Sequence, residues 1–152
     1  MVVIENFMII GGLFFRKDVF MARKALSKKT RLEVYNKFGG HCSYCGKKLE
    51  YKDMQVDHLI PHQRERFKKY SEAELECFEN YMPACRRCNH YKRAHSLEAF
   101  RTMIEEIPSK LYRDSYIYKV GLDFGLVEPH EHKVKFFFEQ VSEDLNTNIE
   151  EF

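Results

Sequence analysis

The sequence predicts an α+β fold, in which helices flank a short β element. Apolar residues recur at helical spacing in residues 27–38 and again in residues 96–107. Between these segments, residues 47–60 contain two short extended runs, and Pro61 would end the second because proline cannot donate a ladder hydrogen bond. The length of 152 residues suits a single domain with one core.

The helix predicted over residues 27–38 has signals at both ends. Ser27 is a suitable N-cap, and Leu32 and Tyr35 share one face of the predicted helix. Gly39-Gly40 follows, and glycine is the usual residue just past a helix C-terminus.

More helices are predicted towards the C-terminus. Ser71 and Glu74 form a capping-box pattern ahead of a helical segment that runs to Phe78. The other predicted elements are a helix near Cys85–Lys92, a helix over Ser96–Ile107 that stops before Pro108, a helix over Ser115–Gly121, and a strand or helix over Val134–Phe138.

The predicted elements divide the chain into three parts. Residues 1–20 form an N-terminal appendage, either a short hairpin turning at Gly11-Gly12 or sequence upstream of a natural start at Met21. Residues 21–95 form the core, and residues 96–152 form a mostly helical extension. The apolar N-terminal run lacks a basic flank and is too short to span a membrane, so we expect neither a secretory signal nor a membrane anchor.

Charge is unevenly distributed along the chain. Between Met21 and Lys119 there are 21 Lys and Arg residues against 13 Asp and Glu, whereas the remainder has 4 basic and 10 acidic residues. A basic middle is the expected footprint of a protein that binds a polyanion. The alternative is that these side chains only solvate a surface.

The five cysteines include two C-x-x-C pairs, Cys42/Cys45 and Cys85/Cys88. Two residues between thiolates let both sulfurs converge on one ion, so the two pairs predict a tetrahedral four-thiolate zinc site. Four thiolates leave no open position, so this Zn²⁺ would be structural. An odd cysteine count and these pairs favour a reducing, cytoplasmic compartment, with Cys77 as a packed thiol.

The 39 residues between the pairs contain a second motif, Val56-Asp57-His58-Leu59-Ile60-Pro61, followed by Asn80, and Asn89 comes directly after Cys88. Together with "CSYCG", "ENYMPACRRCN" and Lys92, this ordered set resembles the HNH endonuclease family in its zinc-ribbon form. The resemblance covers roughly residues 30–95.

The resemblance implies a ββα-metal (His-Me finger) core stabilised by the four-cysteine zinc site. It implies that His58 is the general base, that Asp57 and Asn89 are ligands of a catalytic Mg²⁺ or Mn²⁺, and that Asn80 braces the loop that holds the base. It also implies hydrolysis that leaves 5′-phosphate and 3′-hydroxyl ends.

The chemistry agrees with these roles. An imidazole can accept a proton from water near neutral pH, and carboxylate and amide oxygens suit Mg²⁺ or Mn²⁺. Each residue also has a structural alternative: His58 could be a packed histidine at a strand end, and Asp57, Asn80 and Asn89 could cap turns. His62 is interpreted as an exposed loop histidine.

Basic residues cluster before the first cysteine pair, in the inserted connection and around the second pair. Their side chains would neutralise DNA phosphates without reading sequence. The predicted DNA-binding residues are Lys28, Lys29, Arg31, Arg64, Arg66, Arg86, Arg87, Lys92 and Arg93.

The leading hypothesis is therefore a metal-dependent DNA endonuclease with no membrane partner, acting alone or as a homodimer. One alternative is a zinc-ribbon module that binds nucleic acid without cleaving it. Another is a nuclease subunit that is active only in a larger assembly, such as a phage-packaging or restriction system.

Overall fold

The computed structural model describes residues 3–4, 7–10, 13–16, 25–62, 69–130 and 132–150, and it describes side chains within residues 25–143. The strands are β1 (Val3–Ile4), β2 (Phe7–Ile10), β3 (Leu13–Arg16), β4 (Gln55–His58) and β5 (Tyr81–Ala84). The helices are α1 (Lys28–Asn36), α2 (Glu72–Leu75), the 3₁₀ turn η3 (Phe78–Asn80), α3 (Arg86–Lys92), α4 (Leu97–Glu105), α5 (Ile107–Asp114), α6 (Tyr116–Asp123) and α7 (Phe137–Glu150). Within these described residues, no helix is long and apolar enough to cross a membrane. The α+β prediction is confirmed.

The N-terminal strands form an antiparallel sheet in the order β1-β2-β3. Ile10 pairs with Leu13, so β2 and β3 form a hairpin. Gly11 and Gly12, which were expected at this turn, lie outside the described residues.

Strand β4 pairs with β5, and this differs from the two-stranded element predicted within residues 47–60. The two strands are antiparallel, with Asp57 opposite Met82 and His58 opposite Tyr81. Lys48, on the expected first strand, forms only an isolated bridge with His41. Strand β5 was not predicted because Pro83 lowers the strand propensity of this segment. Proline is tolerated here because each strand of a two-stranded sheet has a free edge.

Helix α1 confirms the first predicted helix. The Ser27 hydroxyl oxygen accepts a hydrogen bond from Thr30 N at 3.0 Å, and Val34 packs completely buried. Gly39 and Gly40 follow with φ of +57° and +77°, a conformation that favours glycine. A Cβ on Gly40 would lie 2.8 Å from the hydroxyl of Tyr35, so this close approach also requires glycine.

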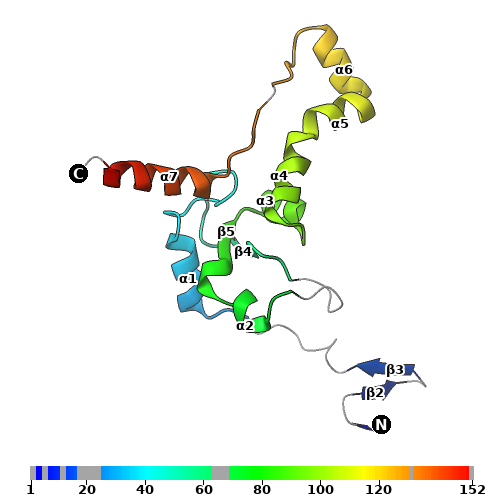
Figure 1. Ribbon diagram of the computed structural model, residues 1–152. Coiled ribbons are helices and arrows are strands. Elements are labelled where there is room, and N and C mark those ends of the chain that lie inside the picture. Colours follow the sequence, from blue (N-terminus) through cyan, green and yellow to red (C-terminus); the bar gives the residue numbers. More distant parts are fainter. Residues whose placement is uncertain are drawn as a thin grey trace.

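The core joins the first cysteine loop to α4 and to the segment before α7. Tyr44 contacts the rings of Phe100 and Phe136 edge-on, with centroids 5.4 and 5.6 Å away. Phe137 N and Phe138 N donate to the carbonyls of Tyr44 and Ser43. The beginning of α7 therefore lies beside the first cysteine loop (Figure 1).

Helices α4, α5 and α6 form an arm that extends away from this core (Figure 1). Ser96 and Ser115 cap α4 and α6 by accepting from Ala99 N and Tyr118 N. The predicted end of α4 before Pro108 is confirmed, since α4 ends at Glu105. No irregular segment follows it in this described part of the chain. Helix α5 begins at once, because proline fits the first turn of a helix.

Candidate active site and zinc centre

The four cysteines of the two C-x-x-C pairs come together at one point. Cys42 and Cys45 lie in the loop after α1, Cys85 is the N-cap of α3, and Cys88 lies in the first turn of that helix. Their sulfurs all lie within 4.8 Å of one another, and Cys45 Sγ is 3.9 Å from Cys85 Sγ.

This cluster fits a structural zinc ion. Tetrahedral Zn–S bonds of about 2.3 Å place sulfurs about 3.8 Å apart, close to the separation of Cys45 and Cys85. Backbone amides also support the sulfurs: Cys85 N donates to Cys42 Sγ at 3.3 Å, and Cys88 N donates to Cys85 Sγ at 3.4 Å. The hydrogen bond between the Cys42 and Cys88 sulfurs lowers the pKa of Cys42 and raises that of Cys88, so zinc binding would displace the proton that the two sulfurs share.

Strand β4 presents Asp57 and His58 on opposite faces, as adjacent strand residues must. The Asp57 carboxylate is buried, and its Oδ2 accepts a hydrogen bond from the Tyr44 hydroxyl at 2.6 Å and forms an ion pair with Lys92 Nζ at 3.0 Å. Lys92 Nζ also donates to the carbonyl oxygen of His58 at 2.7 Å. A single ammonium on α3 therefore holds both consecutive residues of the strand.

The prediction that Lys92 contacts DNA is wrong. Its side chain is 0% exposed and forms an ion pair with Asp57. A basic residue can neutralise a phosphate only from the surface, and the sequence pattern could not distinguish this lysine from its exposed neighbours Arg86, Arg87 and Arg93.

His58 is partly buried at the end of β4. Its ring packs edge-on against His62 and Tyr81, with centroids 4.7 and 5.3 Å away. Nε2 lies 3.4 Å from Glu76 Oε1, but the alignment is poor, and Nε2 has no hydrogen-bond partner among the described residues. Burial lowers the pKa of His58, and Glu76 offsets only part of this effect. The ring is therefore neutral near pH 7 and able to accept a proton.

Asn80 fixes the segment that follows His58. Its Oδ1 accepts from Ile60 N at 2.7 Å, and its Nδ2 donates to Ile60 O at 3.0 Å and to Leu75 O at 2.9 Å. The backbone carbonyl of Asn80 also accepts from Leu59 N at 2.9 Å. This buried amide therefore ties the residues after β4 to the end of α2.

Asn89 lies on α3 three residues before Lys92, so both share one helix face. Its Nδ2 donates to Gln55 Oε1 at 2.7 Å. Gln55 is two residues before Asp57 and shares its face of β4. The structure thus brings Asn89 to the Asp57 side of the strand, with the amide nitrogen engaged by Gln55.

The surroundings of His58 differ from those predicted from the sequence. His62, interpreted as an exposed loop histidine, has a side chain only 15% exposed, and its Nε2 lies 2.7 Å from Glu76 Oε1. Glu76 Oε2 accepts from the Tyr81 hydroxyl at 2.8 Å. Burial raises the pKa of Glu76, but the hydrogen bond from the Tyr81 hydroxyl and the nearby His58 ring lower it by more. The pKa of Glu76 therefore lies below its ordinary value. The one feature of the sequence that pointed to Glu76 was the Ser71–Glu74 capping box, because it begins the helix whose C-cap is Glu76.

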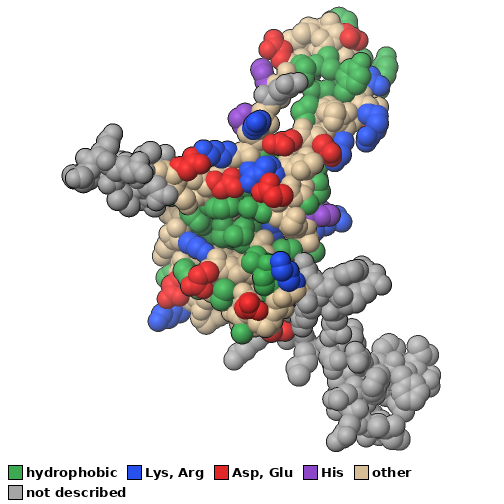
Figure 2. Space-filling view, viewed as in Figure 1, with side chains coloured by type: hydrophobic (Ala, Val, Ile, Leu, Met, Phe, Trp, Pro, Cys, Tyr) green, Lys and Arg blue, Asp and Glu red, His purple; other side chains and the backbone are tan. Residues whose placement is uncertain are grey.

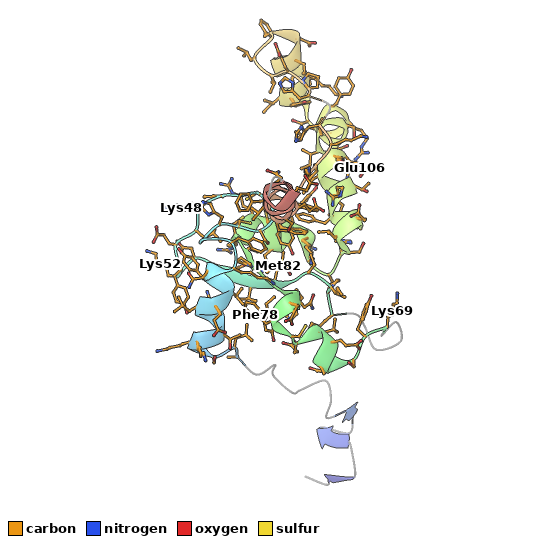
Figure 3. The ribbon with its side chains drawn as sticks, turned by 60° about the vertical axis from the view of Figure 1, so that its left-hand side comes forward. Lys48, Lys52, Lys69, Phe78, Met82 and Glu106 are labelled. Carbon is orange, nitrogen blue, oxygen red and sulfur yellow. The ribbon has the colours of Figure 1, made fainter. Side chains whose placement is uncertain are left out.

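A basic groove of about 1100 Å³ lies along the outer side of the zinc centre and reaches Gln55 and Val56 on β4. Its basic lining residues are Arg31, Lys47, Lys48, Lys52, Arg86, Arg87 and His90. Lys48 and Lys52 project from the same side of the domain (Figure 3). Glu50 and Asp53 also line it, so the groove is basic but not uniformly so.

The other predicted DNA-binding residues fall in different places. Lys28, Lys29 and Arg93 are exposed but do not line the groove. Arg64 and Arg66 lie outside the described residues.

Comparison with known proteins gives one family. No curated protein matches the chain. A crystal structure of the Type II-C Cas9 enzyme from Actinomyces naeslundii is similar at 24% identity and a TM-score of 0.42, over 55% of this chain and 9% of that one. A likeness of this extent does not by itself establish a common fold. Residues 42–95 match the family model described as HNH endonuclease, and this segment spans both cysteine pairs of the zinc centre. The segment that holds both cysteine pairs, Asp57 and His58 is therefore similar to the HNH endonuclease family.

Proposed function

We propose that this protein is a metal-dependent DNA endonuclease with His58 as its general base. The observation that carries this proposal is the position of His58, whose partly buried ring ends β4 inside the segment that matches the HNH family and whose Nε2 has no hydrogen-bond partner among the described residues. A base must be neutral at the working pH to accept a proton from water. Asn80 supports the same role, because it fixes the backbone directly after His58.

In the proposed reaction, His58 takes a proton from a water molecule as its oxygen attacks the phosphorus atom. The bond from phosphorus to the 3′ oxygen breaks, and that oxygen leaves with a proton from solvent. The products are a 5′-phosphate and a 3′-hydroxyl. A divalent ion, when bound, polarises the phosphate and stabilises the leaving oxygen.

Asp57 and Asn89 are the proposed ligands of that ion, and their donor chemistry suits Mg²⁺ or Mn²⁺. Both recorded contacts of Asp57 use Oδ2, and the amide nitrogen of Asn89 is engaged by Gln55. Among the described residues, the other oxygen of Asp57 and the amide oxygen of Asn89 have no such contact, so one oxygen of each side chain would ligate a cation and water would complete the coordination.

The basic groove is the proposed path of the DNA backbone. Arg31, Arg86 and Arg87 line it together with lysines of the loop after Cys45. Phosphate contacts of this kind are independent of sequence and weaken as salt rises. The groove reaches β4 at Gln55 and Val56, directly before Asp57, which supports delivery of the backbone to the catalytic strand.

A plasmid-nicking assay with Mg²⁺ or Mn²⁺ tests this proposal. We expect His58→Ala to lose cutting by at least ~10²-fold, because general acid–base catalysis contributes about 10²–10⁴-fold. His95→Ala is the matched control, since His95 is exposed and outside the site. Equal cutting by the wild type and His58→Ala would remove His58 from the role of base.

The buried Asp57–Lys92 ion pair favours a second candidate, a zinc-ribbon module that binds nucleic acid without cutting it. The Lys92 ammonium neutralises the Asp57 carboxylate and so competes with a metal ion for it. DNA binding that is salt-dependent, with no cutting under any divalent ion, would favour that module.

A further inference from the structure

Three side chains beside the proposed active site offer metal-binding atoms to one another. His58 and His62 flank the turn after β4, and Glu76 is the C-cap of α2. One ligand atom from each lies within 4.8 Å of the other two. We propose that these three residues form a second metal site, separate from the four cysteines, that binds Zn²⁺ or a similar transition ion and thereby inhibits DNA cleavage. The inhibition rests on the proposed function, whereas the metal binding does not.

The distances already approach a coordination shell. Glu76 Oε1 lies 2.7 Å from His62 Nε2 and 3.4 Å from His58 Nε2. Bonds of about 2.1 Å to a tetrahedral zinc ion place its ligands about 3.4 Å apart. Binding therefore requires the His62–Glu76 contact to open by a fraction of an ångström, within a cluster whose three ligand atoms already lie within 4.8 Å of one another. The fourth position would stay open to water.

Two further observations indicate a ligand at this point. His58 Nε2 is buried and lacks a hydrogen-bond partner among the described residues, and buried polar atoms seldom stay unpaired. The Tyr81 hydroxyl donates to the second oxygen of Glu76, so the carboxylate is oriented by a group behind it. Such outer contacts are typical of residues that ligate metals.

The rigidity of the site comes from Asn80. Its side chain bonds the backbone of Ile60, between the two histidines, and the carbonyl of Leu75, next to Glu76. Both segments that supply ligands are therefore tied to one buried amide. The three donors are held close together before any ion arrives.

The ligand atoms of the three side chains determine which ions this site prefers. Two imidazoles and one carboxylate suit Zn²⁺, Co²⁺ or Ni²⁺, whereas Mg²⁺ prefers oxygen ligands and keeps several waters. The ion that binds here thus differs from the ion proposed at Asp57 and Asn89. An imidazole that binds a metal through one nitrogen carries its proton on the other, so it cannot accept a proton from water. An occupied site would therefore remove His58 from catalysis.

Metal binding is tested on the full chain with its four-cysteine site filled by Zn²⁺. We expect calorimetric titration with further Zn²⁺ to show one additional equivalent. The loss of one ligand, in His62→Ala or Glu76→Gln, should weaken that equivalent by at least ~10-fold. Glu79→Gln is the matched control, since Glu79 is an exposed carboxylate on the adjacent 3₁₀ turn. No additional equivalent in the wild type, or equal binding by the variants, would overturn the site.

Inhibition is tested separately in the Mg²⁺ nicking assay with added Zn²⁺. The wild type should lose activity as the site fills, and His62→Ala should need at least ~10-fold more Zn²⁺ for the same loss. Zinc that binds without slowing the wild type would overturn the inhibition. So would a loss of Mg²⁺-supported cutting in His62→Ala equal to that of His58→Ala. If the wild type never cuts, the proposed function fails, while the titration still decides the metal site.

Discussion

The zinc-centred core and the α4–α6 arm differ in what holds them together. In the core, residues far apart in sequence meet: Lys92 pairs with Asp57, and Tyr44 packs edge-on against the stacked rings of Phe100 and Phe136. Helix α4 still reaches the core through Phe100 and through the Arg101–Glu139 ion pair. In the outer arm, formed by α5 and α6, the main contacts join consecutive helices, α4 to α5 and α5 to α6. The core is thus built from long-range contacts around a metal site, whereas the outer arm relies on helix caps and neighbouring turns.

The surfaces of the two regions differ as well. Large apolar side chains of the arm stand in solvent, with Ile117 and Leu126 both 82% exposed, and they gather near its tip (Figure 2). In the core, even a lysine is completely buried. The difference teaches that composition alone does not set burial, because long-range packing decides which apolar groups leave water.

The largest expected effect is loss of the zinc centre. Cys85→Ser should release zinc and unfold residues around both cysteine loops, because structural zinc contributes about 10–16 kcal/mol to folding in small domains. Metal analysis and circular dichroism would measure both consequences. Cys77→Ser is the control. Cys77 lies outside the four-cysteine cluster, so this variant protein should still bind zinc. A folded, zinc-free Cys85→Ser protein would contradict the assignment.

The buried ion pair should give the next largest effect. Lys92→Met leaves the Asp57 carboxylate buried without its cation, which costs about 3–5 kcal/mol. Urea denaturation should show this loss, and the double variant Lys92→Met/Asp57→Asn should recover much of it because no unpaired charge remains. A double variant as unstable as Lys92→Met alone would argue against charge as the cause.

A smaller effect is expected at the base of the arm. Ser96→Ala removes the side-chain oxygen that accepts from Ala99 N, and loss of such a cap costs about 1 kcal/mol. Ser109→Ala is a suitable comparison, since that hydroxyl caps no helix N-terminus. Thermal denaturation would separate the two variants, and equal stability would mean that α4 is held by packing alone.

The smallest effect is expected on the surface of the arm. Ile117→Ser should change stability by no more than about 0.5 kcal/mol, because the side chain is already in water. Phe100→Ala, in the core, should cost about 3–5 kcal/mol. Both values come from chemical denaturation of the same chain. A loss above 1 kcal/mol in Ile117→Ser would show that the arm is covered in solution.

The predictable parts of the fold were those with local signals. Ser27 and Ser71 cap their helices as expected, because a cap depends on residues only two or three positions away. The pairing of β4 with β5 was not predictable in this way. Its partners are more than twenty residues apart, and Pro83 weakens the strand signal.

The candidate site divides in the same way. The cysteine pairs and the Asp57-His58 step are visible in the sequence, because their chemistry depends on residue type and short spacing. The burial of Lys92 and the approach of Glu76 to His58 and His62 are not, because a side chain carries no mark of the element that will cover it.

The sequence by itself therefore determined the α+β class, the four clustered cysteine sulfurs, the similarity of residues 42–95 to the HNH family and most helix boundaries. Only the tertiary structure decided the partner of β4, the buried Asp57–Lys92 pair and the three-residue cluster at His58. The physical reason is that caps and C-x-x-C loops are satisfied within one turn of chain. Strand partners and buried charges are chosen by packing between segments that the sequence keeps far apart.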